Sequence, residues 1–195
     1  MVVSGTDRIS GVEPVTGKVL WSYRGWKCAY PIATPLSIGD GRFFITGGYG
    51  AGCAMFERSR RSATFRAKER FKSKAPGSII HNALLHEGHL YVKDNDKQRR
   101  NGMMCLDLEG NVKWALGKAS SYDFGHMLLA DGMIFDLDGK TGELKLIRPT
   151  PRKYTVLAKA KVFPGGQEIW APMAISGGML VLRDQKTLKC LDVRF

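Results

Sequence analysis

Four histidines are the residues best suited to bind a metal ion or to exchange protons near neutral pH: His81, His86, His89 and His126. Their spacing matches no metal-binding motif. His86 and His89 flank a tight turn, where we expect them to face solvent. We expect His81 and His126 to lie near the start of strands and to face the interior of the fold. There each either contacts a ligand or makes hydrogen bonds as part of the lining, and the sequence leaves both possibilities open.

Glycines and cysteines carry weaker signals. The segment Gly47–Gly52 is rich in glycine, as phosphate-binding loops are, but it lacks their Gly-Lys-Ser/Thr ending and a following helix. It therefore predicts a connection between strands. The cysteines Cys28, Cys53, Cys105 and Cys190 are too far apart for a C-x-x-C metal or redox motif. Cys105 and Cys190 lie within apolar runs, which predicts buried, reduced thiols.

Basic residues outnumber acidic ones, with 30 Lys and Arg against 18 Asp and Glu and a net charge of +12. This balance favours acidic partners. Basic residues concentrate between Arg58 and Lys74, and from Phe65 to Lys72 they alternate with other residues at a period of two. Such alternation predicts an outermost edge strand with a solvent-facing basic row. The segment contains only two aromatic residues, Phe65 and Phe71, which are too few for a base-stacking platform. We therefore expect no nucleic-acid partner and keep polyanion binding as a weaker hypothesis.

A repeated element positions these residues: a turn that contains glycine, followed by an apolar run. The turn glycines are Gly41, Gly88, Gly132 and Gly178, spaced by 47, 44 and 46 residues. Two short strands around such a turn form a hairpin. A period near 45 residues is typical of β-propeller blades. The sequence therefore predicts an all-β fold, a β-propeller of four-stranded antiparallel blades with about four and a half blades present.

We expect residues 1–195 to form a single propeller domain. Its predicted parts are a partial blade (1–25), three blades (32–74, 79–118 and 125–163) and a second partial blade (169–195). Because both ends fall inside a blade, we expect an incomplete ring whose missing N-terminal half is itself a partner. No stretch approaches the ~18 apolar residues of a membrane helix, and the first residues lack the layout of a signal peptide.

The segment Glu13–Trp21 carries a motif of an acidic residue, a Thr-Gly-Lys turn and a tryptophan in the next strand. Weaker copies are Asp107–Trp114 and Asp138–Leu144. The motif resembles the blade repeat of the PQQ-like β-propeller family. That family includes eight-bladed quinoprotein alcohol dehydrogenases and non-catalytic members, such as the propeller lipoprotein of the bacterial outer-membrane assembly machine. The resemblance implies a bacterial protein, periplasmic or extracellular at full length, of which this chain is about the C-terminal half.

The connections between second and third strands, and between successive blades, are long and emerge on the same face of the predicted fold. Long loops on a rigid scaffold are common binding surfaces. We therefore predict a non-enzymatic binding or scaffold module that contacts a protein or polymer through these loops and the central channel. The candidate residues are Trp26, Tyr30, Tyr49, His81, Lys93, Asn95, Tyr122, His126, Trp170 and Arg183.

The alternative is part of a quinone-dependent alcohol dehydrogenase whose missing half supplies the cofactor ligands. The family resemblance then implies PQQ stacked on a tryptophan, calcium held by Glu, Asn and Asp, and a pair of adjacent cysteines. Trp170 stands at a plausible channel position, but the chain has no adjacent cysteines and no ligand set that matches the motif. PQQ and calcium are therefore expected only under this alternative, and no catalytic residue is predicted.

Overall fold

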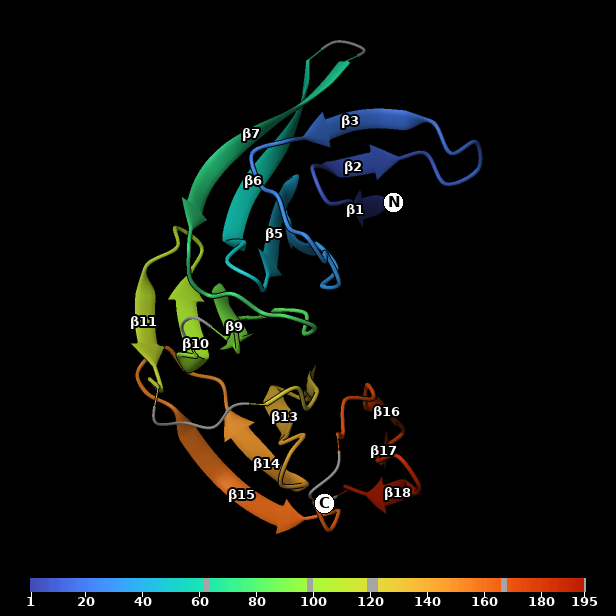
Figure 1. The fold of residues 1–195 in the computed structure, drawn as a ribbon, viewed down its shortest axis with the longest axis vertical. Coiled ribbons are helices and arrows are strands. Elements are labelled where there is room, and N and C mark those ends of the chain that lie inside the picture. The colour runs from blue at the N-terminus through green and yellow to red at the C-terminus, as the bar shows by residue number, and fades with distance from the viewer. Residues whose placement is uncertain (62–63, 98–99, 119–122, 166–167, 195) are drawn as a thin grey trace. The chain divides into compact units, whose positions relative to one another are not determined.

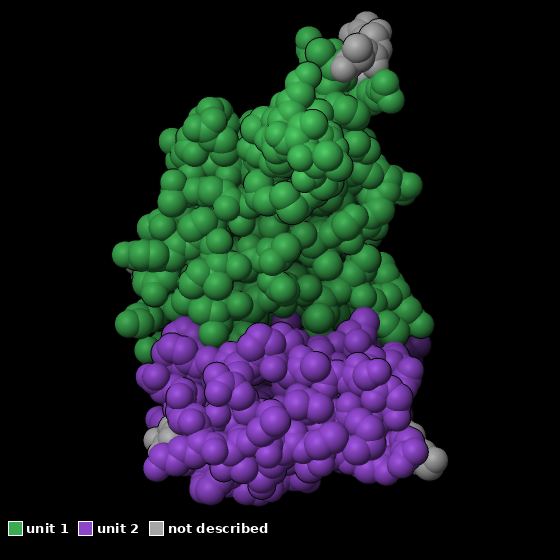
Figure 2. Space-filling view, turned by 90° about the vertical axis from the view of Figure 1, so that its right-hand side faces the viewer, with its two compact units in different colours: residues 1–120 green, residues 121–195 purple. Residues whose placement is uncertain are grey.

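The computed structural model describes residues 1–61, 64–97, 100–118, 123–165 and 168–194. The described residues form antiparallel β-sheets joined by turns and loops, and they include no helix that is long and apolar enough to cross a membrane. The chain divides into two compact units, residues 1–120 and 121–195, which Figure 2 colours separately. The expectation of a single domain with a fixed number of blades stays a prediction.

Unit 1, residues 1–120, contains three sheets whose strands are hydrogen-bonded in chain order (Figure 1). Their bounds are β1 Val2–Ser4, β2 Ile9–Val12 and β3 Val19–Tyr23 in the first sheet, β4 Leu36–Gly39, β5 Arg42–Gly47, β6 Gly52–Arg61 and β7 Thr64–Ser73 in the second, and β8 Leu84–His86, β9 His89–Asp94, β10 Gly102–Asp107 and β11 Val112–Ala115 in the third. Neighbouring strands are antiparallel throughout, as the repeat predicts.

Unit 2, residues 121–195, contains two sheets with the same up-and-down order. Their bounds are β12 Met127–Ala130, β13 Met133–Leu137, β14 Glu143–Arg148 and β15 Thr155–Lys161 in the first, and β16 Ala174–Ser176, β17 Met179–Arg183 and β18 Leu188–Asp192 in the second. Together with unit 1, the described residues form eighteen strands, and the predicted all-β fold of antiparallel sheets is confirmed.

The repeated glycine turn has the geometry that a two-residue hairpin needs. At the turn between β4 and β5, Asp40 and Gly41 both have positive φ angles, 50° and 76°. Two consecutive positive φ angles match the right-handed twist of the flanking strands, and glycine at the second position adopts such an angle without steric cost. The turns before β9, β13 and β17 repeat this pattern of paired positive angles.

The first strand of the third sheet is shorter than the sequence predicts. The apolar run of the predicted blade 79–118 favours a strand over 79–85, but β8 begins only at Leu84, because side chains bind the backbone upstream. Gly77 donates its amide to Asp94 at 3.0 Å, and Ile79 donates its amide to the side chain of Asn95 at 2.9 Å. With these amides already bonded, the segment runs as a buried loop, and His81 lies in this loop ahead of the strand.

Strand β7 is the outermost strand of its sheet, as the basic alternation predicts, but the alternation breaks at a β-bulge. The register shifts opposite Met55 and Phe56, where Phe71 and Glu69 are the partners on β7. An inserted residue reverses the faces on its two sides. Phe65 therefore packs against the cluster around Trp21, on the side of the first sheet, whereas Phe71 packs against the cluster of the third sheet.

The acidic turns are local structures and do not mark one fixed place in the repeat. Glu13 and Asp107 follow the strands before β3 and β11 and accept turn amides from Thr16 and Asn111 at 2.8 Å each. Asp138 binds its turn in the same way but lies between β13 and β14, the second and third strands of its sheet. The predicted copy of the motif at Asp138 is therefore out of phase with the other two.

The prediction of a buried Cys190 is wrong, although Cys105 is fully buried. Strand β18 alternates exposed and half-buried residues, and Cys190 falls on its exposed face. Strand β10 is an inner strand of its sheet, and Gly102–Leu106 are buried without a break. An apolar run thus indicated burial in β10 but not in β18, the last strand of its sheet.

Candidate functional site: a cationic pocket in unit 1

Trp26, Lys93 and Asn95 are buried in the structure, so the expectation that they face a partner from exposed loops is wrong for them. His81, which we expected to face the interior, is buried as well, and its role there stays a prediction. Trp26 is 0% exposed and belongs to the apolar cluster of the first two sheets. His81, Lys93 and Asn95 are 2%, 1% and 5% exposed. Asn95 holds the loop before β8, as described above. Asn95 and Trp26 thus bind loop backbone from the interior of unit 1, through the Ile79 amide and the Gly52 carbonyl.

Tyr30 and Tyr49 fulfil the expectation of exposed aromatic residues on long loops. Both side chains are more than half exposed, and their ring centroids lie 5.0 Å apart in a tilted arrangement. Tilted aromatic pairs are favourable at this distance. Two loops separated by a hairpin are thus joined at their tips by an aromatic pair. Whether the pair binds a partner stays a prediction.

The other predicted site residues belong to unit 2. Trp170 is 40% exposed and packs on Phe124, with ring centroids 4.9 Å apart. His126 is half-buried, and its Nδ1 accepts a hydrogen bond from the Met173 amide at 3.2 Å, a bond that fixes the loop before β16. Arg183 is exposed at the end of β17. Tyr122 lies outside the described residues.

A pocket of about 470 Å³ opens in unit 1 where three segments meet, and we call it the cationic pocket. Its lining residues are Arg24, Gly25, Lys27, Gly50, Ala51, Lys72, Ser73 and Lys74. Four of these residues are basic and none is acidic. The volume falls within the range of about 300–1,000 Å³ usual for ligand sites. A recess lined in this way attracts anionic groups.

Trp26 positions the loop that carries Arg24 and Lys27. Its indole Nε1 donates to the carbonyl of Gly52 at 3.4 Å, which ties this loop to the start of β6. The ring lies directly against Gly47, where an added Cβ would come within 2.7 Å of the indole. The next buried anchor is Cys28, whose amide donates to the carbonyl of Thr6 at 3.0 Å. Because Trp26 and Cys28 on either side of Lys27 are buried, the Lys27 side chain is exposed to solvent.

The second wall of the pocket, at Gly50 and Ala51, is held by a buried carboxylate. Gly50 donates its amide to Asp96 Oδ2 at 2.7 Å, and Asp96 is 2% exposed. Neighbouring Asp94 is also buried, and burial raises the pKa of its carboxyl group even though Gly77 and Asn101 donate hydrogen bonds to it. These carboxylates are occupied by loop amides, so their place in the structure is to shape the loops.

The third wall comes from the end of β7. Lys72 donates from Nζ to the carbonyl of Gly25 at 2.7 Å, which brings the strand against the first loop. Three residues before Lys72 on the same strand, Glu69 accepts a hydrogen bond from the Tyr23 hydroxyl at 2.5 Å. Burial, followed by the hydrogen bond and charge of Glu69, raises the pKa of Tyr23. Gly25 leaves room for this contact, since an added Cβ would lie 2.4 Å from the Tyr23 hydroxyl.

The charge of the pocket is only partly neutralised by its surroundings. Arg24 forms an ion pair with Asp7 at 2.7 Å, with both side chains about half exposed. Exposed ion pairs of this kind are worth roughly 0–1 kcal/mol and exchange readily. Lys72 is bonded to a neutral carbonyl. The pocket therefore keeps a net positive charge toward solvent.

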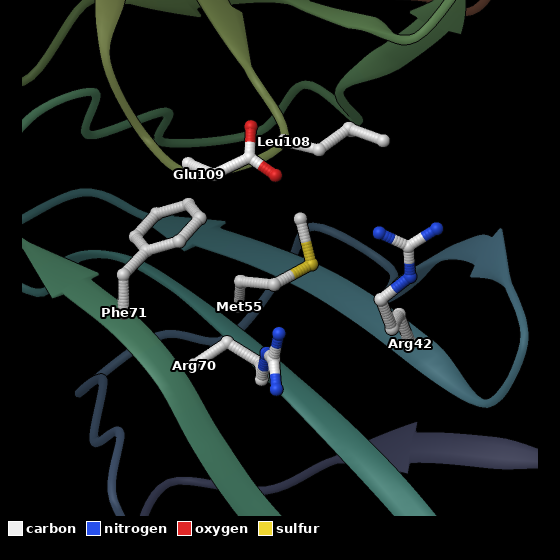
Figure 3. Close-up of a pocket in the computed structure, with 6 residues that line it drawn as sticks. All are labelled: Arg42, Met55, Arg70, Phe71, Leu108 and Glu109. Carbon is white, nitrogen blue, oxygen red and sulfur yellow. The ribbon is translucent and has the colours of Figure 1, made fainter.

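A second, smaller recess of about 170 Å³ lies between the β4–β7 sheet and the turn after β10 (Figure 3). In that view Met55 lies in the middle beneath Leu108 and Glu109, with Phe71 on the left, Arg42 on the right and Arg70 below. Arg70 is ion-paired with Glu57 at 3.3 Å. Because this recess contains a carboxylate and is floored by core residues, it is less suited to an anion than the cationic pocket.

The sequence points to parts of the cationic pocket without assembling it. Lys27 lies in a predicted long loop, and Lys72 and Lys74 lie at the end of the predicted basic edge. Their meeting depends on the buried contacts of Trp26, which no local pattern reveals. Arg24 and the backbone of Gly50 carry no separate sequence signal.

The described residues do not provide the donor set expected for a quinone and calcium site. Within the described ranges, no group of three or more His, Cys, Asp or Glu side chains is placed to hold a metal ion. The acidic pair Asp94 and Asp96 is occupied by backbone amides, and Trp170 packs on Phe124. The residues present therefore do not fit PQQ with calcium.

Comparison with known proteins supports the fold. No family model and no curated protein sequence matches the chain. Among solved structures, the chain is similar to BamB from Moraxella catarrhalis, with 10% identity and a TM-score of 0.50 over 93% of this chain and 66% of that one. It is also similar to a chain in the crystal structure of a nidogen/laminin complex, with 13% identity and a TM-score of 0.54 over 95% of this chain and 68% of that one.

The chain thus spans about two thirds of the length of each of these structures. At such low identity the likeness concerns the fold alone. Taken with the antiparallel sheets in chain order, it shows that this protein has a β-propeller fold.

Proposed function

We propose that this chain is a non-enzymatic binding module that holds an acidic segment of a protein or polymer in the cationic pocket. The observation that carries the proposal is the convergence of Arg24, Lys27, Lys72 and Lys74 around one recess without an acidic lining residue. Exposed Tyr30 and Tyr49 are close to this recess in the chain, and aromatic and arginine side chains are enriched in protein interfaces. The likeness to BamB and to a chain from a nidogen/laminin complex is consistent with a binding propeller.

The chain's resemblance to the PQQ-like repeat family belongs to the same proposal. Non-catalytic members of that family use the propeller as a scaffold, and the charge of this pocket suits an acidic partner. No observation on the described residues favours the dehydrogenase alternative. Titration of the chain with PQQ and calcium, with PQQ binding followed by absorbance, tests that alternative directly. Stoichiometric binding of PQQ would overturn the proposal of a non-enzymatic module.

The test of the pocket uses a fluorescein-labelled hexaglutamate peptide and fluorescence anisotropy. We expect saturable binding by the chain, and at least about tenfold weaker binding by the double variant Lys27→Glu with Lys74→Glu. The matched control is Lys18→Glu with Lys113→Glu, which makes the same change in net charge away from the pocket. Equal loss in both variants would show attraction to net charge alone and would overturn a defined site.

A further inference from the structure

Strand β7 has an open edge, and its half at Thr64–Lys68 lies outside the lining of the cationic pocket. In its sheet the order is β4-β5-β6-β7, so β7 pairs only with β6. Both strands of this hairpin have 10 residues, more than any other strand of the described chain. An edge strand presents a row of backbone donors and acceptors to which another strand can add.

The far half of the hairpin extends beyond the rest of its sheet. Strand β5 pairs with β6 only from Gly52 to Glu57, and the Arg58 amide still donates to the carbonyl of Gly41 at 2.7 Å, whereas Ser59–Arg61 pair with β7 alone. Figure 1 shows the two strands running past the ends of β5, and the same part projects from unit 1 at the top of Figure 2. Among the described strands, the edge of β7 that faces away from β6 has no strand partner in this sheet, so an added strand can pair beside Thr64–Lys68.

The two faces of this far half differ. Register places Arg58, Arg60, Phe65 and Ala67 on one face and Ser59, Arg66 and Lys68 on the other. On the first face, Phe65 and Ala67 pack against the core cluster, and the guanidinium groups of Arg58 and Arg60 lie 4.9 and 5.6 Å from the Phe65 ring centroid. On the second face, Arg66 and Lys68 are exposed.

In the part of the chain that the structure describes, Arg66 and Lys68 form no ion pair of their own, although Glu57, which pairs with Arg70, lies opposite Lys68 on β6. Elsewhere on β7, Arg70 is paired with Glu57, Lys72 is bonded to Gly25, and Glu69 accepts from Tyr23. Among the described residues, Arg66 and Lys68 have no ion-pair partner. Two residues apart on one strand, they stand about 6.6 Å from each other along the edge.

We propose that β7 binds an extended segment of an acidic protein partner by strand addition, with acidic residues at alternate positions beside Arg66 and Lys68. Small apolar residues fit the intervening positions, beside Phe65 and Ala67. A second copy of β7 is disfavoured as the occupant because it would place Arg and Lys beside Arg and Lys. Nucleic acid is also disfavoured, since Phe65 is half-buried beneath two guanidinium groups and offers no free ring for base stacking.

The test uses the whole chain and a labelled eight-residue peptide of alternating Glu and Val. Two matched peptides have the same composition and charge: one is arranged as Glu-Glu-Val-Val blocks, and the other is N-methylated at every Val. We expect the alternating peptide to bind at least about tenfold more tightly than either, because alternation matches the face of a strand and N-methylation removes backbone donors. Hydrogen exchange of the β7 amides should slow only with the alternating peptide.

The variant Arg66→Glu with Lys68→Glu should weaken binding of the alternating peptide at least about tenfold and should bind a Lys-Val peptide instead. Thermal unfolding checks that this variant is folded, and Arg66→Gln with Lys68→Gln provides a milder second version. Equal binding of the three acidic peptides would overturn strand addition. Binding of a ten-residue oligothymidylate that matches the peptide in affinity and in dependence on Arg66 and Lys68 would also overturn it, in favour of a general polyanion surface.

Discussion

Two basic surfaces of unit 1 carry similar charges in different arrangements. In the cationic pocket, basic residues from three segments converge around a recess of about 470 Å³. On the edge of β7, Arg66 and Lys68 follow one another along a single strand. The pocket depends on loops held by buried side chains, whereas the edge depends on the local alternation of the strand.

This difference separates two kinds of recognition. Converging charges surround a compact anion and need the anchors behind them to stay in place. Charges in a row bind an extended partner, and hydrogen bonds to the strand backbone fix the direction of that partner and the spacing of its side chains. The two surfaces should therefore respond differently to mutation, salt and pH.

The largest expected effect is loss of the pocket's main anchor. Trp26→Ala should lower the free energy of unfolding by about 3–5 kcal/mol, because it removes a fully buried aromatic side chain from the core. Thermal or denaturant unfolding measures the change. Val15→Ala, at a position that is 91% exposed, is the control and should stay within about 0.5 kcal/mol of the parent chain. A small effect of Trp26→Ala would mean that the loop does not depend on this anchor.

Charge reversal should separate the two surfaces. Lys27→Glu with Lys74→Glu should weaken hexaglutamate binding at least about tenfold and leave the Glu-Val peptide within about twofold, since its residues are absent from the far half of β7. Arg66→Glu with Lys68→Glu should give the reverse pattern. Both variants are measured with both peptides by anisotropy. Equal loss of affinity for both peptides in both variants would show that the two surfaces attract anions through their combined charge and not as separate sites.

Salt should weaken the pocket more than the edge. Between 50 and 300 mM NaCl we expect hexaglutamate affinity to fall by roughly tenfold and Glu-Val affinity by roughly threefold, since screening acts on charges but spares backbone hydrogen bonds. Anisotropy titrations at four salt concentrations give the two slopes. Identical slopes would contradict a contribution from strand pairing at β7.

The smallest expected effect concerns the contact that joins β3 to β7. Tyr23 has a raised pKa, so the folded state holds the phenolic proton more tightly than the unfolded state. The free energy of unfolding should therefore fall as pH rises above about 10, the ordinary pKa of tyrosine. Tyr23→Phe should cost roughly 0.5–1.5 kcal/mol near neutral pH, by loss of the bond to Glu69, and should make this alkaline decline shallower.

Denaturant unfolding from pH 8 to 11 checks the prediction. Tyr91 also has a raised pKa and remains in both proteins, so the difference between them isolates Tyr23. Tyr30→Phe, at an exposed position, serves as the control. An alkaline decline that is unchanged in Tyr23→Phe would remove the titration of Tyr23 as its cause.

The sequence by itself determined the strands and hairpins. The paired turn residues, such as Asp40 and Gly41, and the spacing of the glycines predict hairpins that the structure contains, with β5, β9 and β13 each following its glycine turn. It also predicted the exposed basic edge of β7. These features follow from neighbouring residues, because turn geometry and side-chain alternation depend on local backbone conformation.

Only the tertiary structure decided which loop residues face solvent. Trp26 and Tyr30 lie four residues apart in one predicted loop, yet one is fully buried and the other is 60% exposed. Likewise, the bulge in β7 sends Phe65 and Phe71 to opposite sheets. Burial depends on the surfaces that neighbouring sheets bring against a side chain, and those surfaces come from residues distant in the sequence.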